Sequence, residues 1–254
     1  MPAVRRPART LLRAAARRRE AAPLLALLLA SCLVLGFVEI ADELGEDEVH
    51  AVDEAILLAL REPGDPADPL GPEWVEEVGR DLTALGSMGV LALVSLAVVG
   101  YLLIDRKRRA ALFVLLAVGG GAALSLLLKR GFDRPRPDLV PHEAEVFTAS
   151  FPSSHAMLAA VAYLTLGALL ARVHGGRAAK AYLLLLAALV AFLVGASRVY
   201  LGVHWPTDVL AGWAGGAAWA LLCWLAAMAL QRRGKVEEGE ADEATGPGAG
   251  QPPM

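Results

Sequence analysis

Two histidines and an aspartate stand next to short polar segments in a chain whose residues are 56% hydrophobic. His204 precedes Asp208 by four residues, a spacing at which the carboxylate can reach one ring nitrogen of the imidazole. Such a contact fixes the histidine tautomer and leaves the other ring nitrogen free to attack an electrophile. His155 directly follows the Pro-Ser-Ser segment 152–154, where serine is typical of a helix start and free backbone amides can bind an anion.

Basic residues accompany these groups. Segment 129–137 reads Lys-Arg-Gly-Phe-Asp-Arg-Pro-Arg-Pro, and the pair Ser197 and Arg198 ends six residues before His204. Taken singly, a histidine near a membrane surface is usually a polar anchor, and an arginine at a helix end usually reaches toward lipid headgroups. Taken together, two imidazoles, a carboxylate, serines and several cations supply the positioning, charge neutralisation and nucleophile that phosphoryl transfer needs. The pattern therefore favours a phosphoryl-transfer site.

The rest of the chain predicts the elements that must position these groups. Its apolar residues form blocks of about 18–22 residues that are apolar all round, the length at which a helix crosses roughly 30 Å of hydrocarbon. A soluble helical bundle would instead alternate apolar and polar faces. We therefore expect an all-α, polytopic membrane protein with six transmembrane helices. Their approximate ranges are 22–41, 86–104, 110–128, 156–173, 181–200 and 208–230.

Lysine and arginine positions predict the orientation of these spans. If six spans alternate in direction, 17 of the 24 basic residues fall on one side. An excess of Lys and Arg marks cytoplasmic segments, so we assign this side, with both termini, to the cytoplasm. The three polar segments then all lie on the opposite side, because each stands at the outer end of a span. We expect them to form one site at the extracytoplasmic face of the plasma (inner) membrane.

The regions outside the spans differ in composition. The chain divides into a basic cytoplasmic arm at 1–21, a six-helix membrane domain at 22–233 and a disordered acidic tail at 234–254. The outer segment 42–85 is acidic and predicts two amphipathic helices separated by prolines. These helices either lie at the membrane interface or cover the site as a lid. The glycines at 119–121, Gly212 and Gly216 predict close helix contacts.

The polar segments resemble the three-part signature of the phosphatidic acid phosphatase type 2 family, which is Lys-x6-Arg-Pro, Pro-Ser-Gly-His and Ser-Arg-x5-His-x3-Asp. In this chain the three parts are 129–137, 152–155 and 197–208. The spacing agrees within each part, and a core of six spans is also the family's architecture. One position departs from the signature, since Ser154 stands where the family usually has glycine. Serine keeps the backbone amide but adds a side chain to the pocket.

The resemblance implies a role for each matching residue. His204 would attack phosphorus and form a phosphohistidine, Asp208 would orient it, and His155 would protonate the leaving oxygen and then activate water. The phosphate oxygens would be held by Lys129, Arg136, Ser153, Ser154 and Arg198. The resemblance implies no metal and no other cofactor. Arg130 and Arg134 fall outside the fixed positions of the signature, so we assign them no role.

We therefore expect an integral membrane enzyme, a metal-independent phosphatase that hydrolyses lipid phosphates or diphosphates. Undecaprenyl diphosphate or a phosphatidate-type lipid is the favoured substrate. Two alternatives stay open at this point: a lipid phosphoryl transferase, and a non-catalytic lipid-phosphate binder or transporter. The charges stand at helix ends and not within spans, which speaks against a transporter. The expected partners are the lipid substrate and the bilayer, without nucleic acid, and the sequence does not indicate an oligomeric state.

Overall fold

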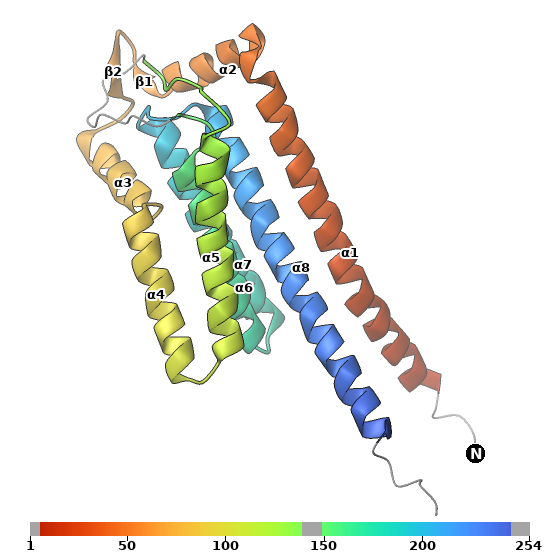
Figure 1. Cartoon of the computed structure of the whole chain (residues 1–254). Coiled ribbons are helices and arrows are strands. Elements are labelled where there is room, and N and C mark those ends of the chain that lie inside the picture. Colours follow the sequence, from red (N-terminus) through yellow and green to blue (C-terminus); the bar gives the residue numbers. More distant parts are fainter. Residues whose placement is uncertain (1–5, 139–148, 245–254) are drawn as a thin grey trace, which may run out of the picture.

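The computed structural model describes residues 6–138 and 149–244, which form a bundle of long helices with smaller elements at one end (Figure 1). The long helices are α1 (Arg6–Asp42), α4 (Met88–Ile104), α5 (Arg108–Lys129), α6 (Ser154–Val173), α7 (Arg177–Tyr200) and α8 (Pro206–Ala244). The smaller elements are η1 (Glu43–Gly45), α2 (Asp47–Leu58), β1 (Arg61–Glu62), β2 (Asp65–Pro69) and α3 (Glu73–Ala84). Helix α1 begins, and α8 ends, at the end of the bundle away from α2 and α3.

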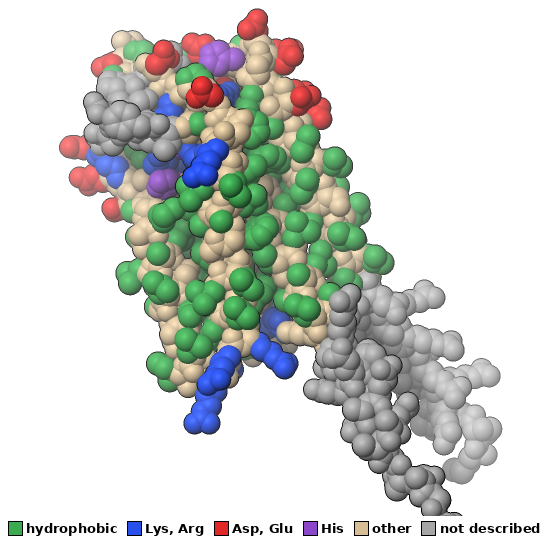
Figure 2. Space-filling view, in the orientation of Figure 1, with side chains coloured by type: hydrophobic (Ala, Val, Ile, Leu, Met, Phe, Trp, Pro, Cys, Tyr) green, Lys and Arg blue, Asp and Glu red, His purple; other side chains and the backbone are tan. Residues whose placement is uncertain are grey.

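Among the described residues, five single helices are long and apolar enough to cross a membrane: α1, α5, α6, α7 and α8. A sixth span results when α4 is counted with α3, from which it is bent by 50°. Helices suit a membrane because they satisfy their backbone hydrogen bonds internally. Exposed apolar side chains, mostly leucine, cover the outside of the bundle (Figure 2). The predicted all-α, polytopic membrane architecture is confirmed.

Two helices extend beyond the predicted spans. Helix α1 begins at Arg6, within the predicted basic arm, and α8 runs to Ala244, within the region for which composition predicts a disordered tail. The extension of α1 is rich in alanine and arginine, which have high helix propensity, and the extension of α8 consists mostly of charged residues, so neither is apolar enough to be part of a span. The structure therefore has helix at 234–244, where we expected disorder, and residues 245–254 lie outside the described part of the chain.

Helix α6 lies at the centre of the bundle and contacts α4, α5, α7 and α8. Alanine is the commonest residue on its buried face, and small side chains let neighbouring helix backbones approach closely. For example, Ala159 and Ala160 form one buried cluster with Ala191 and Val194 of α7. This packing matters for the site because His155 stands in the first turn of α6.

The close approach of α8 to α6 depends on two of the predicted contact glycines. A Cβ atom on Gly212 would lie 2.7 Å from the backbone oxygen of Ser153, and a Cβ atom on Gly216 would lie 2.4 Å from that of Met157. Real Cβ atoms do not come so close to a backbone oxygen, so a larger residue would push the two helices apart. Within 119–121 the second and third glycines are similarly enclosed by neighbouring side chains.

Helix α2, the hairpin and α3 lie over the end of the bundle where α6 and α8 begin (Figure 1). The hairpin pairs Arg61 with Pro69 in antiparallel fashion, and Gly64 in its turn adopts φ 98°, a left-handed conformation that favours glycine. Arg61 is buried and donates a hydrogen bond to the backbone oxygen of Tyr200 at 2.9 Å. The hydroxyl of Tyr200 donates to the backbone oxygen of Leu70 at 3.1 Å. These contacts fix the segment to the end of α7.

Both predicted amphipathic helices of the outer segment are present as α2 and α3, but α2 turns an unexpected face inward. Its buried residues are Asp53 and Leu57, whereas the apolar Val52 and Ile56 are exposed. Two of the apolar residues on which the prediction of this helix rests therefore point outward. A carboxylate instead points into the protein, where it needs partners.

Replacing Gly216 with alanine is expected to destabilise the bundle, because the added methyl group has no space between α8 and α6. Overpacking of this kind costs about 1–3 kcal/mol. Thermal unfolding of the purified protein in detergent should therefore occur at lower temperature for Gly216→Ala. Gly119→Ala is the matched control, since a Cβ atom at this position meets nothing within 4 Å. Equal stability of the two variants would contradict the assigned contact.

Candidate active site

The three polar segments meet where α5 and α7 end and α6 and α8 begin. The backbone N–H of Ser153 donates to the backbone oxygen of Asp208 at 3.0 Å, which joins the starts of α6 and α8. Beyond the end of α5, Arg136 donates from Nη1 to the backbone oxygen of Val203 at 2.7 Å. The segments therefore lie together at one end of the bundle, as their predicted topology requires.

His204 is almost completely buried, and both of its ring nitrogens have polar neighbours. Nδ1 lies 3.3 Å from Oδ2 of Asp208, the contact that the four-residue spacing predicts. Nε2 lies 3.3 Å from Nη1 of Arg136. Because a guanidinium can only donate hydrogen bonds, Nε2 of the neutral ring carries the lone pair and Nδ1 carries the proton. The free lone pair is therefore on Nε2, and this nitrogen faces a cation.

The start of α8 explains why an aspartate stands at position 208. Pro206 begins the helix, where its missing N–H costs nothing. Two residues later, Oδ2 of Asp208 accepts the backbone N–H of Trp205 at 3.0 Å, the contact that the third residue of a helix makes in a capping box. The same oxygen accepts the hydroxyl of Ser150 at 2.5 Å. One carboxylate therefore both caps α8 and orients His204.

Burial lowers the pKa of His204 to about 3, against the opposing effect of the hydrogen bond and the negative charge of Asp208. The positive charges of Arg136 and Arg198 act in the same direction as burial. His204 is therefore neutral at neutral pH, and the neutral imidazole is the form that can attack an electrophile. Burial also lowers the pKa of Arg136, although the carboxylate of Asp208 opposes this change.

Three cations assigned from the sequence lie in one cluster: Lys129, Arg136 and Arg198 are close enough for their charges to act on one another. Lys129 donates from Nζ to the backbone oxygen of Ala149 at 2.6 Å, and Arg198 donates from Nη1 to Oγ1 of Thr83 at 3.0 Å. Partly buried cations repel one another unless an anion neutralises them, so the cluster suits a phosphate group. No group of three His, Cys, Asp or Glu side chains that could hold a metal occurs in the part of the chain that the structure describes.

Two buried donors in this cluster have no hydrogen-bond partner within the described residues. They are Nε of Arg198 and the hydroxyl of Ser153. Buried polar atoms are nearly always paired, and leaving one unpaired costs about 1–3 kcal/mol. Phosphate oxygens can supply acceptors for both donors. Both residues are among those that the sequence assigns to phosphate binding.

His155 occupies the second position of α6 and belongs to the same cluster. The charges of Arg198, Arg136 and Lys129 act on His155, and the two arginines also act on His204. The two imidazoles therefore share cationic neighbours at one end of the bundle.

Ser154, the residue that departs from the family signature, directs its added hydroxyl toward a neighbouring helix. Its Oγ accepts a hydrogen bond from the hydroxyl of Ser125 on α5 at 3.0 Å. Ser125 is buried, so the pair satisfies a polar group inside the bundle. The serine is thus accommodated by a partner on α5 while its backbone N–H stays in the first turn of α6.

The structure adds residues to the site that the sequence analysis did not assign. They are Asp53, Thr83, Arg134 and Ser150, each of which contacts another polar side chain of the site. The sequence could have indicated Arg134, because it lies between Lys129 and Arg136 in a strongly basic segment. The sequence could not indicate Asp53, Thr83 or Ser150 as site residues, because their contacts with the site depend on the tertiary structure.

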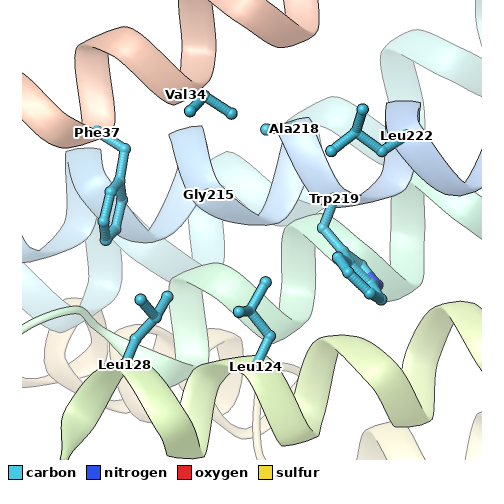
Figure 3. A pocket seen from close by; sticks show the side chains of 8 residues that line it. All are labelled: Val34, Phe37, Leu124, Leu128, Gly215, Ala218, Trp219 and Leu222. Atoms are coloured by element: carbon cyan, nitrogen blue, oxygen red, sulfur yellow. The ribbon is translucent and has the colours of Figure 1, made fainter. Parts of the chain in front are cut away.

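An apolar pocket of about 170 Å³ lies beside the site, between α1, α5 and α8 (Figure 3). It is lined by Val34, Phe37, Leu124, Leu128, Gly215, Ala218, Trp219 and Leu222. Leu128 directly precedes Lys129 in the chain, which brings the pocket near the cation cluster. Phe37 packs against Phe151 with ring centroids 5.6 Å apart, next to the Pro-Ser-Ser segment. The lining suits a hydrocarbon chain.

Comparisons with known proteins place these features in context. A family model described as the PAP2 superfamily matches residues 110–232, which include all eight site residues assigned from the sequence. The chain is 34% identical over 190 residues to phosphatidylglycerophosphatase B of Bacillus subtilis, a match that covers 72% of this chain and 87% of that protein. It is 37% identical over 82 residues to undecaprenyl-diphosphatase of Sulfolobus acidocaldarius, which covers 32% of each chain.

A solved structure is also similar. It is the crystal structure of a transmembrane PAP2 type phosphatidylglycerolphosphate phosphatase from Bacillus subtilis, with a TM-score of 0.67 and 32% sequence identity. The match covers 76% of this chain and 93% of the other. The similarity therefore extends over most of the bundle and not only over the polar segments.

Removing the Ser125 hydroxyl should weaken the contact between α5 and α6. Hydrogen bonds between membrane helices contribute about 0.6–1 kcal/mol, so Ser125→Ala and Ser154→Ala should each lower stability by this amount. The double variant should lose no more than either single variant, since both changes remove one bond. Ser95→Ala is the control, because this buried hydroxyl on α4 has no partner within the described residues. Additive losses in thermal unfolding would count against the pairing.

Proposed function

The chain belongs to the PAP2 superfamily and is a multi-pass membrane lipid phosphatase, and from this premise we propose that His204 is its nucleophile. One observation carries the proposal, namely that the two ring nitrogens of His204 have different polar neighbours. Nδ1 is 3.3 Å from the carboxylate of Asp208, and Nε2 is 3.3 Å from Nη1 of Arg136. The neutral ring therefore offers its lone pair on the side where a cation can hold a phosphate.

In the first step of the proposed mechanism, Nε2 of His204 attacks phosphorus and forms a P–N bond. The P–O bond to the lipid breaks, and the leaving oxygen takes the electron pair together with a proton from His155. Asp208 accepts the Nδ1 hydrogen bond and stabilises the positive charge that develops on the imidazole. This step requires the protonated form of His155.

In the second step, the now neutral His155 takes a proton from water, and the resulting hydroxide attacks phosphorus. The P–N bond breaks, inorganic phosphate leaves, and His204 regains its lone pair. Lys129, Arg136 and Arg198 are proposed to hold the phosphate oxygens through both steps. The hydroxyl of Ser153 and the backbone N–H of Ser154 would add hydrogen bonds at the start of α6, where the helix dipole favours an anion.

We propose a glycerophospholipid monophosphate as the substrate. The similarity to phosphatidylglycerophosphatase B, which extends over 87% of that protein, supports a phosphate ester on a glycerol-based headgroup. The apolar pocket between α1, α5 and α8 supports a lipid over a water-soluble ester, because it offers a place for a hydrocarbon chain next to the cation cluster. Water acts as the acceptor in this proposal, in place of a second lipid.

A polyprenyl diphosphate is the second candidate. It is favoured by the identity of 37% to undecaprenyl-diphosphatase, although this match covers only 32% of that protein. Both candidates present a terminal phosphate to the same cations and an apolar tail to the same bundle. They differ in tail shape and in the charge next to the phosphate, which a substrate comparison can separate.

We further propose that the protein lies in the plasma (inner) membrane with its site on the extracytoplasmic face. The support is the distribution of Lys and Arg along the chain, which assigns 17 of the 24 basic residues to the other side, because cytoplasmic segments carry such an excess. Figure 2 shows basic side chains without acidic ones at that end of the described bundle. The basic arm at 1–21 and residues 234–254 would then be cytoplasmic.

His204→Ala is expected to reduce phosphate release from lipid substrates by at least about 10³-fold, because the variant cannot form a P–N bond. Rapid quenching with radiolabelled substrate should trap an acid-labile phosphohistidine in the unmodified protein and none in the variant. His174→Ala is the matched control, since this exposed histidine follows the opposite end of α6. Full activity of purified, folded His204→Ala would end the proposed mechanism.

A substrate comparison in detergent should rank phosphatidylglycerophosphate above undecaprenyl diphosphate in kcat/KM, and both above glycerol phosphate. The apolar tail lowers KM because it enters the pocket, at about 0.8 kcal/mol for each buried methylene. Release of inorganic phosphate, measured for each compound at several concentrations, tests the order. A preference for glycerol phosphate would contradict the lipid assignment, and a preference for the diphosphate would select the second candidate.

A further inference from the structure

A buried arginine connects the orienting carboxylate of the site to the outer segment. Arg134 donates from Nη1 to Oδ1 of Asp208 and from Nη2 to Oδ2 of Asp53, each at 2.7 Å. The side chains of both aspartates are fully buried, and that of Arg134 is only 8% exposed. Asp53 belongs to α2, so the bridge joins an element of the outer segment to the start of α8 through the loop that follows α5.

The bridge divides the two oxygens of Asp208 between different tasks. Oδ1 is taken by Arg134, whereas Oδ2 accepts from Ser150, from the backbone N–H of Trp205 and from Nδ1 of His204. A carboxylate held at both oxygens cannot rotate about its Cβ–Cγ bond. The acceptor for the Nδ1 proton therefore stays in one place, and with it the direction of the lone pair on Nε2.

Asp53 holds the other end of this arrangement. Its Oδ1 accepts the backbone N–H of Thr207 at 2.9 Å, and its Oδ2 accepts the hydroxyl of Thr207 as well as Arg134. Thr207 is the second residue of α8, so a carboxylate from α2 satisfies a free N–H in the first turn of another helix. The negative charge there also interacts favourably with the helix dipole.

The guanidinium of Arg134 is enclosed on a further side by an indole. Its Cζ lies 5.7 Å from the ring centroid of Trp205, and the indole N–H donates to the backbone oxygen of Pro135 at 3.1 Å. The planar fork of arginine can satisfy two carboxylates and an aromatic face at once, which the single ammonium of lysine cannot. The position is therefore specific for arginine.

We propose that Asp53 and Arg134 are positioning residues of the phosphatase reaction, which act through Asp208 to fix the tautomer and direction of His204. The inference rests on the proposed role of His204 and adds two residues that are not among the proposed catalytic or phosphate-binding residues. A buried ion pair contributes little net stability, because desolvation offsets the attraction between the charges. A role in geometry explains better why three charged side chains are buried at this place. The outer segment then contributes to the geometry of the site through Asp53 of α2.

The test compares Asp53→Asn and Arg134→Lys in the full-length protein with the lipid substrate of highest activity. Both variants should lower kcat by about 10–100-fold, the usual cost of losing a residue that orients a reacting side chain, and should change KM less than twofold. Rapid quenching should show slower formation of the phosphohistidine. Glu48→Gln is the matched control, because it removes an exposed carboxylate from the same helix. A rise in KM with unchanged kcat would overturn the proposal.

The decisive measurement repeats both substitutions in an Asp208→Asn background, by single turnover at high enzyme concentration. If Asp53 and Arg134 act through Asp208, the double variants should be no slower than Asp208→Asn alone. Multiplying losses would overturn the proposal, and so would full activity of either single variant. If Asp53→Asn does not fold, Arg134→Lys, which keeps the charge, decides alone. A wrong assignment of His204 as the nucleophile would be recognised by a different result, namely full activity of His204→Ala.

Discussion

The site depends on how one buried carboxylate is satisfied. A negative charge in the interior costs several kcal/mol unless it is paired and hydrogen-bonded, so the surroundings of Asp208 cannot vary freely. Its donors come from the loop after α5, the segment before α6 and the segment before α8. Satisfying this single group therefore brings together the chain segments that carry Arg134 and Arg136, the serines before α6, and His204. The orientation of His204 is a consequence of the same requirement.

A second constraint is the distance between α6 and α8. Both imidazoles stand at the starts of these helices, His155 on α6 and His204 immediately before α8, so the spacing of the two axes sets the spacing of the two rings. Gly212 and Gly216 allow the backbones to touch, and the hydrogen bond from Ser153 to the backbone of Asp208 fixes the axial register. Packing in the apolar part of the bundle is thereby coupled to the chemistry at its end. Since interiors are close-packed, small changes in packing are not absorbed locally.

The cation cluster and the acidic outer segment have opposite electrostatic roles. Lys129, Arg136 and Arg198 repel one another, and within the described residues Nε of Arg198 and the hydroxyl of Ser153 have no hydrogen-bond partner, so the cluster suits an anion. Arg134, a few residues away, is instead neutralised within the protein by two carboxylates. One of these two carboxylates, Asp53, comes from α2. The outer segment thus contacts two of these cations, Arg134 through Asp53 of α2 and Arg198 through Thr83 of α3.

The sequence by itself determined the features that depend on short windows of the chain. All-round apolar blocks give membrane spans because a helix must bury its whole surface in lipid, and the contact between His204 and Asp208 follows from their separation of four residues at the start of α8. The tertiary structure decided which distant polar residues complete the site. Asp53 meets Arg134 across 81 residues, Thr83 meets Arg198 across 115, and Ser150 meets Asp208 across 58. Such pairs leave no periodic trace, because they depend on how whole helices and the outer segment are arranged in space, and neither propensity nor spacing encodes that arrangement locally.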